Sequence, residues 1–184
     1  IYGSGCQISE ISMKGATVSP SKYDILFTGD WKDVTVDGYL EELTRLFYNS
    51  YPRLYQRWGN GTEPTTITFK ADNNYDGVAY CQGTTVCVST AYANSHPTDI
   101  GFFSHEITHS VQQYSGKLNY GDDVAWWTEN MANYGGFRYF HWSNPKYVQI
   151  YEATDTSLQD WGYQQYRNNK WFFAYMDSKY PTRK

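Results

Sequence analysis

The sequence contains no uninterrupted apolar run of about 18 residues, the length that a helix needs to cross a bilayer. It also lacks a block of basic residues, since 15 Lys and Arg stand against 19 Asp and Glu and the formal net charge is −4. Such a block is typical of proteins that bind nucleic-acid phosphates or anionic lipid. The N-terminus IYGSGCQISE has no charged-then-apolar leader pattern. We therefore expect neither a nucleic-acid partner nor contact with a membrane.

Branched aliphatic residues are scarce. All Ile, Leu and Val residues together are fewer than the aromatic residues, which are 9 Phe, 7 Trp and 19 Tyr. One ring buries roughly 150–250 Å², and Tyr and Trp keep a polar group as well, so rings can build the core instead. The chain of 184 residues has no internal repeat or linker, and we expect a single domain over residues 1–184 and a monomer.

Cysteine is rare too, with three residues in all. Cys81 and Cys87 flank a Gly-containing turn between two β-rich runs, which predicts a hairpin of residues 78–81 and 86–90 closed by a disulfide. A disulfide indicates an oxidising compartment, and the glycosylation sequon at residues 60–62 points the same way. The cysteine spacing excludes a zinc site built from CxxC pairs.

The apolar pattern predicts strands early in the chain and helices later. We expect strands at residues 23–27 and 66–70 besides the hairpin, and a helix over 37–58 that Pro52 kinks or divides. Beyond residue 97 the pattern is helical throughout. This order is typical of an α+β fold in which a mixed or antiparallel sheet packs on helices.

The segment PTDIGFFSHEITHSVQQYSG at residues 97–116 predicts an amphipathic helix, capped at residue 98 or 99 and ended by the glycine at 116. On it, His105 and His109 lie four residues apart and project from one face beside Glu106. Two such imidazoles can bind one tetrahedral ion, and the carboxylate can take the proton of a water that the ion activates. A merely solvated histidine pair is the alternative for this motif alone.

The next predicted helix, DDVAWWTENMANYGGFRYF, offers a third ligand. It begins at Asp122 or Asp123 and carries Glu129, twenty residues after His109. Two His and one Glu make a three-ligand site with a fourth position open for water. A ligand from Asp122 or Asp123, as in aspzincins, stays an alternative, although both residues are better explained as helix caps. The metzincin class is excluded because its Gly and His are missing after His109.

Several stretches resemble the plant basic secretory protein family, a group of thermolysin-like, gluzincin-type zinc metallopeptidases. The similar segments are DGVAY at 76–80, the strand at 86–92, HEITH at 105–109, residues 127–134 and DWGYQQYRNNKWFFAYM at 160–176. The resemblance implies a zincin-like fold, in which a Glu-bearing helix and C-terminal helices follow the HExxH helix. It also implies a secreted enzyme with one zinc ion and a polypeptide substrate.

By this resemblance His105, His109 and Glu129 are the zinc ligands and Glu106 is the general base. Asn133 stands where the family has an Asp behind a ligand imidazole. An amide oxygen can still accept the ring N–H, but without charge it raises the basicity of the ligand less. We therefore predict weaker zinc retention than after the substitution Asn133→Asp.

Contacts with the substrate and the oxyanion are predicted from the same architecture. The strand before the metal helix is expected to form the sheet edge on which an extended peptide pairs, through Val86, Val88 and Thr90. An ordinary paired strand is the alternative. A developing oxyanion also needs a donor besides zinc, and Tyr163 is the first candidate and His141 the second.

The sequence thus predicts a secreted zinc peptidase that hydrolyses peptide bonds with a metal-activated water and Glu106 as base. The rival hypothesis is a secreted, catalytically inactive module that binds peptide or glycan through aromatic surfaces. The presence of Glu106 favours the enzyme, because an inactive site would have little reason to keep a residue that contributes nothing to metal binding. A glycoside hydrolase is disfavoured, since no convincing pair of carboxylates lies near the motif.

Overall fold

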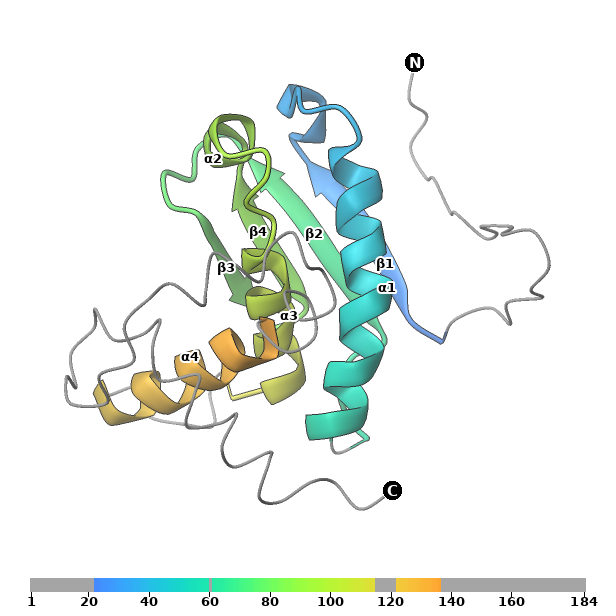
Figure 1. Cartoon of the computed structure of the whole chain (residues 1–184), viewed down its shortest axis with the longest axis vertical. Helices are drawn as coiled ribbons and strands as arrows, with labels where there is room; N and C mark the ends of the chain where they lie inside the picture. The colour runs from blue at the N-terminus through green and yellow to red at the C-terminus, as the bar shows by residue number, and fades with distance from the viewer. Residues whose placement is uncertain (1–21, 60, 115–121, 137–184) are drawn as a thin grey trace.

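A computed structural model describes residues 22–59, 61–114 and 122–136, which form a four-stranded sheet with helices on it (Figure 1). The strands are β1 (Asp24–Gly29), β2 (Thr66–Asp72), β3 (Ala79–Gln82) and β4 (Thr85–Ser89). Their order in the sheet is β1-β2-β4-β3. The first three in this order run parallel, and β3 is antiparallel to β4. The sheet is therefore mixed and the fold is α+β, as predicted.

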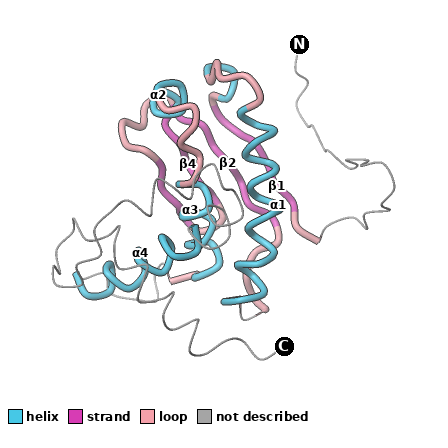
Figure 2. The backbone as a smooth tube through the Cα atoms, viewed as in Figure 1, coloured by secondary structure: helices cyan, strands magenta, loops and turns pink. Residues whose placement is uncertain are grey.

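The helices that matter for the site lie on one face of this sheet. The helical elements are η1 (Trp31–Asp33), α1 (Tyr39–Trp58), α2 (Thr90–Ser95), α3 (Phe102–Gln112) and α4 (Asp122–Gly136). Helix α1 joins β1 to β2 and lies beside α3, and α4 packs against α3 (Figures 1 and 2). No helix in the described part of the chain is long and apolar enough to span a membrane.

The core between the sheet and the helices combines aromatic rings with branched aliphatic side chains, so the rings add to the aliphatic core and do not replace it. Phe47 of α1, Phe69 of β2 and Phe103 of α3 are all fully buried. The ring centroid of Phe69 lies 6.1 Å from that of Phe47 and 4.9 Å from that of Phe103. Each such pair adds about 0.5–1.5 kcal/mol to the burial of its area, so the rings anchor α1 and α3 to the sheet.

Helix α1 continues through Pro52, so of the two predicted effects of this proline, a kink or a division, the division is wrong. A proline inside a helix loses a hydrogen bond and clashes with the preceding turn, at a cost of about 3 kcal/mol. Phe47 before it and Tyr51 and Leu54 around it are all fully buried in the same core. Because the turns on both sides of Pro52 pack on one surface, burial outweighs the local penalty.

The boundaries of α3 differ from the prediction at both ends. The helix begins at Phe102, since Asp99 accepts a hydrogen bond from the Tyr92 hydroxyl (2.7 Å) instead of capping the helix. It ends at Gln112, because Gln113 adopts a left-handed conformation with φ of 52°. The sequence did not indicate α2, whose first turn is capped by the side chain of Ser89. The last residue of the predicted strand, Thr90, is therefore helical.

The hairpin is present, but the predicted disulfide across it is wrong. Cys81 and Cys87 are free thiols. The register pairs Cys87 with Tyr80 and Cys81 with Val86. Because side chains alternate between the two faces of a sheet, the cysteines point to opposite faces. Cys81 lies against the Ser110 hydroxyl of α3 at 3.1 Å, on the helix side.

Candidate metal centre

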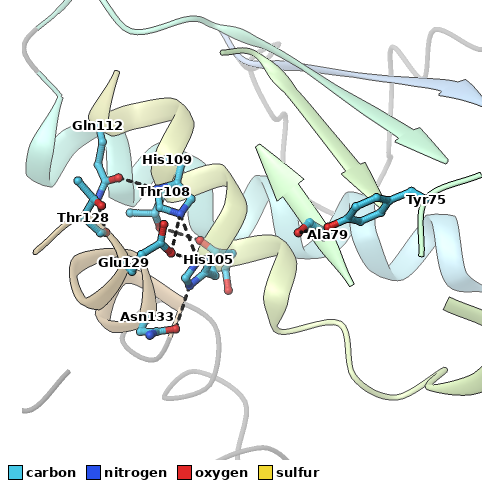
Figure 3. Close-up of polar contacts among 10 residues, drawn as sticks. Tyr75, Ala79, His105, Thr108, His109, Gln112, Thr128, Glu129 and Asn133 are labelled. Carbon is cyan, nitrogen blue, oxygen red and sulfur yellow. Dashed lines mark hydrogen bonds and ion pairs between the residues drawn. The ribbon is translucent and has the colours of Figure 1, made fainter. Parts of the chain in front are cut away.

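Helices α3 and α4 bring the three predicted ligands together (Figure 3). The Nε2 atoms of His105 and His109 are 3.1 Å apart. One carboxylate oxygen of Glu129 lies 3.0 Å from the first and 3.3 Å from the second. These three form the one group of metal-binding type found among the described residues. The proposed ligand set of two His and one Glu is thus assembled, and the side chains of the alternative ligands Asp122 and Asp123 lie outside the described residues.

Close packing of the two helices depends on glycine at the end of α4. A Cβ on Gly135 would lie 2.5 Å from the Thr108 hydroxyl oxygen and 3.1 Å from Leu54 Cδ2. At Gly136 the nearest atom, Ser104 Oγ, would be 3.3 Å away. Because neither position has a side chain, α4 can approach α3 closely enough for Glu129 to reach both histidines.

The other nitrogen of each imidazole faces an amide oxygen (Figure 3). His105 Nδ1 is 2.9 Å from Asn133 Oδ1, on α4. His109 Nδ1 is 2.7 Å from Gln112 Oε1, one turn further along α3. Since an amide oxygen only accepts, Nδ1 carries the hydrogen in both neutral rings and Nε2 offers its lone pair. Asn133 therefore lies behind the His105 imidazole, in the place that the family resemblance implies for it.

This arrangement fits a zinc ion. When both imidazoles are neutral with hydrogen on Nδ1, the three facing atoms carry lone pairs, and at 3.0 to 3.3 Å they repel one another unless a metal ion or a proton lies between them. Zinc bonds of 2.0–2.1 Å in tetrahedral geometry separate the ligand atoms by about 3.3 Å. The donor set, two imidazoles and a carboxylate, is also one that zinc prefers. Spacing and chemistry thus agree.

Without a metal, the electrostatics of the centre favour a proton between the same atoms. Burial opposes the protonation of His109, but hydrogen bonding to Glu129 and the charge of its carboxylate outweigh it and raise the pKa of the ring. Burial also disfavours the charged form of Glu129, yet hydrogen bonds from His105 and His109 hold the pKa of this carboxyl far below its usual range. Both shifts favour the state in which positive charge sits beside the carboxylate.

Glu106, between the two histidines in sequence, is buried next to the centre. Burial raises the pKa of its carboxyl above the usual value, although the charges of His105 and His109 act in the opposite direction. No hydrogen bond to this carboxylate exists within the described residues. A buried carboxylate of raised pKa beside a metal centre has the properties of a general base.

The strand that was predicted to form the free edge of the sheet lies inside it. β4 pairs with β2 on one side and with β3 on the other, so Val86 and Val88 are fully buried and Thr90 belongs to α2. The assignment of these three residues to substrate binding is therefore wrong. The hairpin returns antiparallel beside β4, and among the described strands β3 lies at that edge of the sheet. The oxyanion candidates Tyr163 and His141 lie outside the described residues.

The sequence analysis missed Gln112 in the site and Tyr75 beside the edge strand β3. Gln112 had a signal, because it follows His109 by three residues and shares its helix face. Tyr75 had none, because it precedes β3 in a loop. Its hydroxyl donates a 3.3 Å hydrogen bond to the Ala79 carbonyl (Figure 3). Burial, followed by the charge of Glu106, raises the pKa of Tyr75.

Comparison of the chain with protein-family models, curated proteins and solved structures gave no significant match. The function of the chain therefore has to be inferred from the geometry of its own site.

Proposed function

We propose that this protein is a zinc-dependent peptidase of zincin-like fold. His105, His109 and Glu129 hold the ion, and Glu106 is the general base. The observation that carries the proposal is the convergence of three lone-pair atoms at tetrahedral spacing, with a buried carboxylate beside them. A bound zinc ion supplies Lewis-acid chemistry, which polarises a carbonyl and lowers the pKa of a water to about 7.

The residues of the chain divide the remaining work. Glu106 accepts the proton of the attacking water and later gives it to the leaving amine, and its raised pKa makes both transfers easier. The amide oxygens of Asn133 and Gln112 keep the imidazoles turned with Nε2 toward the centre. Glu129 contributes the negative charge that holds a dication in a buried site.

The edge strand β3 is the proposed binding site for an extended polypeptide. Ser89 donates to the Val78 carbonyl, so in the antiparallel ladder the backbone groups of Ala79 and Cys81 point away from β4. Those groups can pair with a peptide strand. The strand also packs against the face of α3 that carries Glu106, since Cys81 Sγ lies 3.1 Å from the hydroxyl of Ser110, one turn after Glu106.

Tyr75 occupies part of this edge in the free protein. Its hydroxyl bonds to the Ala79 carbonyl, which is the acceptor that a backbone N–H of a paired peptide would use. The ring also packs against Tyr80 with the centroids 5.0 Å apart. A peptide that pairs along β3 must therefore displace the Tyr75 hydroxyl.

Secretion is part of the proposal and depends on the family resemblance and the sequon, because the hairpin disulfide is absent. The rival function, an inactive binding module, is favoured by exposed rings on the described surface. Trp127 on α4 is 43% exposed and Tyr80 on β3 is 39% exposed. Stacking on a peptide or a glycan needs rings that are accessible in this way.

One experiment separates the two functions. We expect the purified protein to contain one zinc ion and to cleave a peptide library, and the substitution Glu106→Gln to reduce cleavage about 10²–10⁴-fold with zinc retained. Glu41→Gln, the same chemical change on an exposed part of α1, is the matched control. Undiminished cleavage by the Glu106→Gln variant would contradict the mechanism. Zinc without cleavage by the wild type would favour the binding module.

A further inference from the structure

We infer that Gln112 is a positioning residue that couples the ligand His109 to the helix carrying Glu129, so that zinc binding and the docking of α4 on α3 stabilise each other. The inference rests on the proposed metal site. It adds to that site a residue from outside the HExxH motif and the Glu-bearing helix.

Gln112 makes two hydrogen bonds, one as acceptor within α3 and one as donor to α4 (Figure 3). Its Oε1 accepts from His109 Nδ1 at 2.7 Å, within α3. Its Nε2 donates to the backbone carbonyl of Thr128 at 2.9 Å, on α4. The residue is only 8% exposed, so water competes little for either bond. One side chain thus connects a ligand imidazole to the backbone next to Glu129.

The orientation of this amide is fixed by its partner on α4. The Thr128 carbonyl can only accept, so the amide nitrogen of Gln112 must face it. The amide oxygen then faces His109, and Nδ1 of that ring must carry the hydrogen. The other ring nitrogen of His109, Nε2, then keeps the lone pair that a metal needs. Helix α4 therefore selects the tautomer of an imidazole on α3.

The contacts close a ring that spans both helices. It runs from His109 through Gln112 and Thr128 to Glu129, whose carboxylate oxygen returns to His109 Nε2 at 3.3 Å. A zinc ion bound by both His109 and Glu129 would hold these two residues of the ring together. By linkage, whatever strengthens the docking of α4 then strengthens metal binding, and the reverse also holds.

The test uses two substitutions at one position and a neighbour as control. Gln112→Met keeps the unbranched shape and removes both hydrogen bonds. Gln112→Glu keeps the oxygen that accepts from His109 but cannot donate to Thr128 when ionised. Gln113→Met is the control, because the Gln113 amide is bonded to the Ser110 carbonyl and to neither imidazole.

Zinc affinity of the full chain is measured by competition with a chelator. We expect Gln112→Met to weaken binding about 10–100-fold, and Gln113→Met to change it less than threefold. Gln112→Glu is expected to bind zinc with an affinity between those of the wild type and Gln112→Met, because its carboxylate still accepts from His109 Nδ1 while the bond that docks α4 is lost. The metal-free form of this variant should melt at a lower temperature than the wild type, because the bond to α4 is lost. A purely structural role predicts equal losses of affinity in both Gln112 variants, and that result would overturn the proposal.

A second measurement needs no metal. Nitrogen-15 NMR of the histidine rings, at a pH at which both are neutral, is expected to show hydrogen on Nδ1 of His109 in the wild type and in Gln112→Glu. In Gln112→Met this preference should be lost. Hydrogen on Nε2 of His109 in the wild type would overturn the inference. If the wild type binds no zinc, the proposed function fails, whereas equal binding by the wild type and Gln112→Met defeats only this coupling.

Discussion

The contact of α1 with the sheet and the contact of α4 with α3 are built from different materials. Between α1 and the sheet lie fully buried apolar side chains such as Leu43, Phe47 and Phe69. Between α3 and α4 lie hydroxyls, amides, imidazoles and a carboxylate, with glycine at the closest approach. The first contact is stabilised by removal of apolar surface from water, which needs no ligand. The second collects lone pairs around one point, which is the position proposed for the zinc ion. Zinc should therefore stabilise the second contact and leave the first unchanged.

The largest effect on stability is expected in the apolar contact. Phe69→Ala removes a fully buried ring and should lower the free energy of unfolding by about 3–5 kcal/mol. Thermal melts with and without zinc measure this loss. We expect the increase in melting temperature caused by zinc to be the same as in the wild type. A zinc effect that vanishes in this variant would show that the two contacts are not independent.

In the polar contact, Gly135→Ala should cost about 1–3 kcal/mol, because the new Cβ would lie 2.5 Å from the Thr108 hydroxyl oxygen. The displacement of α4 should also weaken zinc binding, since Glu129 moves with its helix. Gly136→Ala is the graded control, because its nearest atom lies at 3.3 Å. Equal zinc affinity in the Gly135→Ala variant and the wild type would argue against close packing as the source of the ligand geometry.

Asn133→Asp tests the contact between α3 and α4 by adding a negative charge to it. A carboxylate at this position accepts from His105 Nδ1 as the amide oxygen does, and it makes Nε2 a stronger ligand. We expect zinc to bind about tenfold more tightly, measured by competition with a chelator. Wild-type binding that is as tight or tighter would defeat this prediction.

Glu106 should lower the stability of the metal-free protein at neutral pH. Its carboxyl has a raised pKa in the folded state because of burial, so folding favours the protonated form. The ionised form costs stability increasingly as the pH rises from the unfolded value of about 4.5 through the folded pKa. Glu106→Gln should therefore raise the melting temperature at pH 7 and have less effect near pH 4. A lower melting temperature of this variant at pH 7 would contradict the sign.

The smallest effect is expected at the edge strand. Tyr75→Phe removes the hydroxyl that bonds to the Ala79 carbonyl, so a peptide no longer has to displace it. A typical hydrogen bond contributes about 1 kcal/mol, which corresponds to a decrease in KM of about fivefold. Peptide-cleavage kinetics measure the change, with kcat expected to stay the same. A higher KM would indicate that Tyr75 binds the substrate instead of competing with it.

The sequence predicted what depends on local spacing. The two histidines, Glu106 and Glu129 were found because helical periodicity fixes which residues share a face, and the strands were found because their apolar patterns are local. The position of β4 inside the sheet could not be predicted in this way, because strand order depends on pairings between distant segments. The prediction of a disulfide was wrong for a related reason, since the turn sets the strand register, and this register places Cys81 and Cys87 on opposite faces of the sheet.

X-ray diffraction at the zinc absorption edge, from crystals of the protein purified without chelators, is the most direct test of the metal centre. We expect one anomalous peak, from a zinc ion bound by Nε2 of His105, Nε2 of His109 and the Glu129 carboxylate at about 2.0–2.2 Å, with no protein atom at the fourth position. An absent peak, or a fourth ligand from the chain itself, would contradict it.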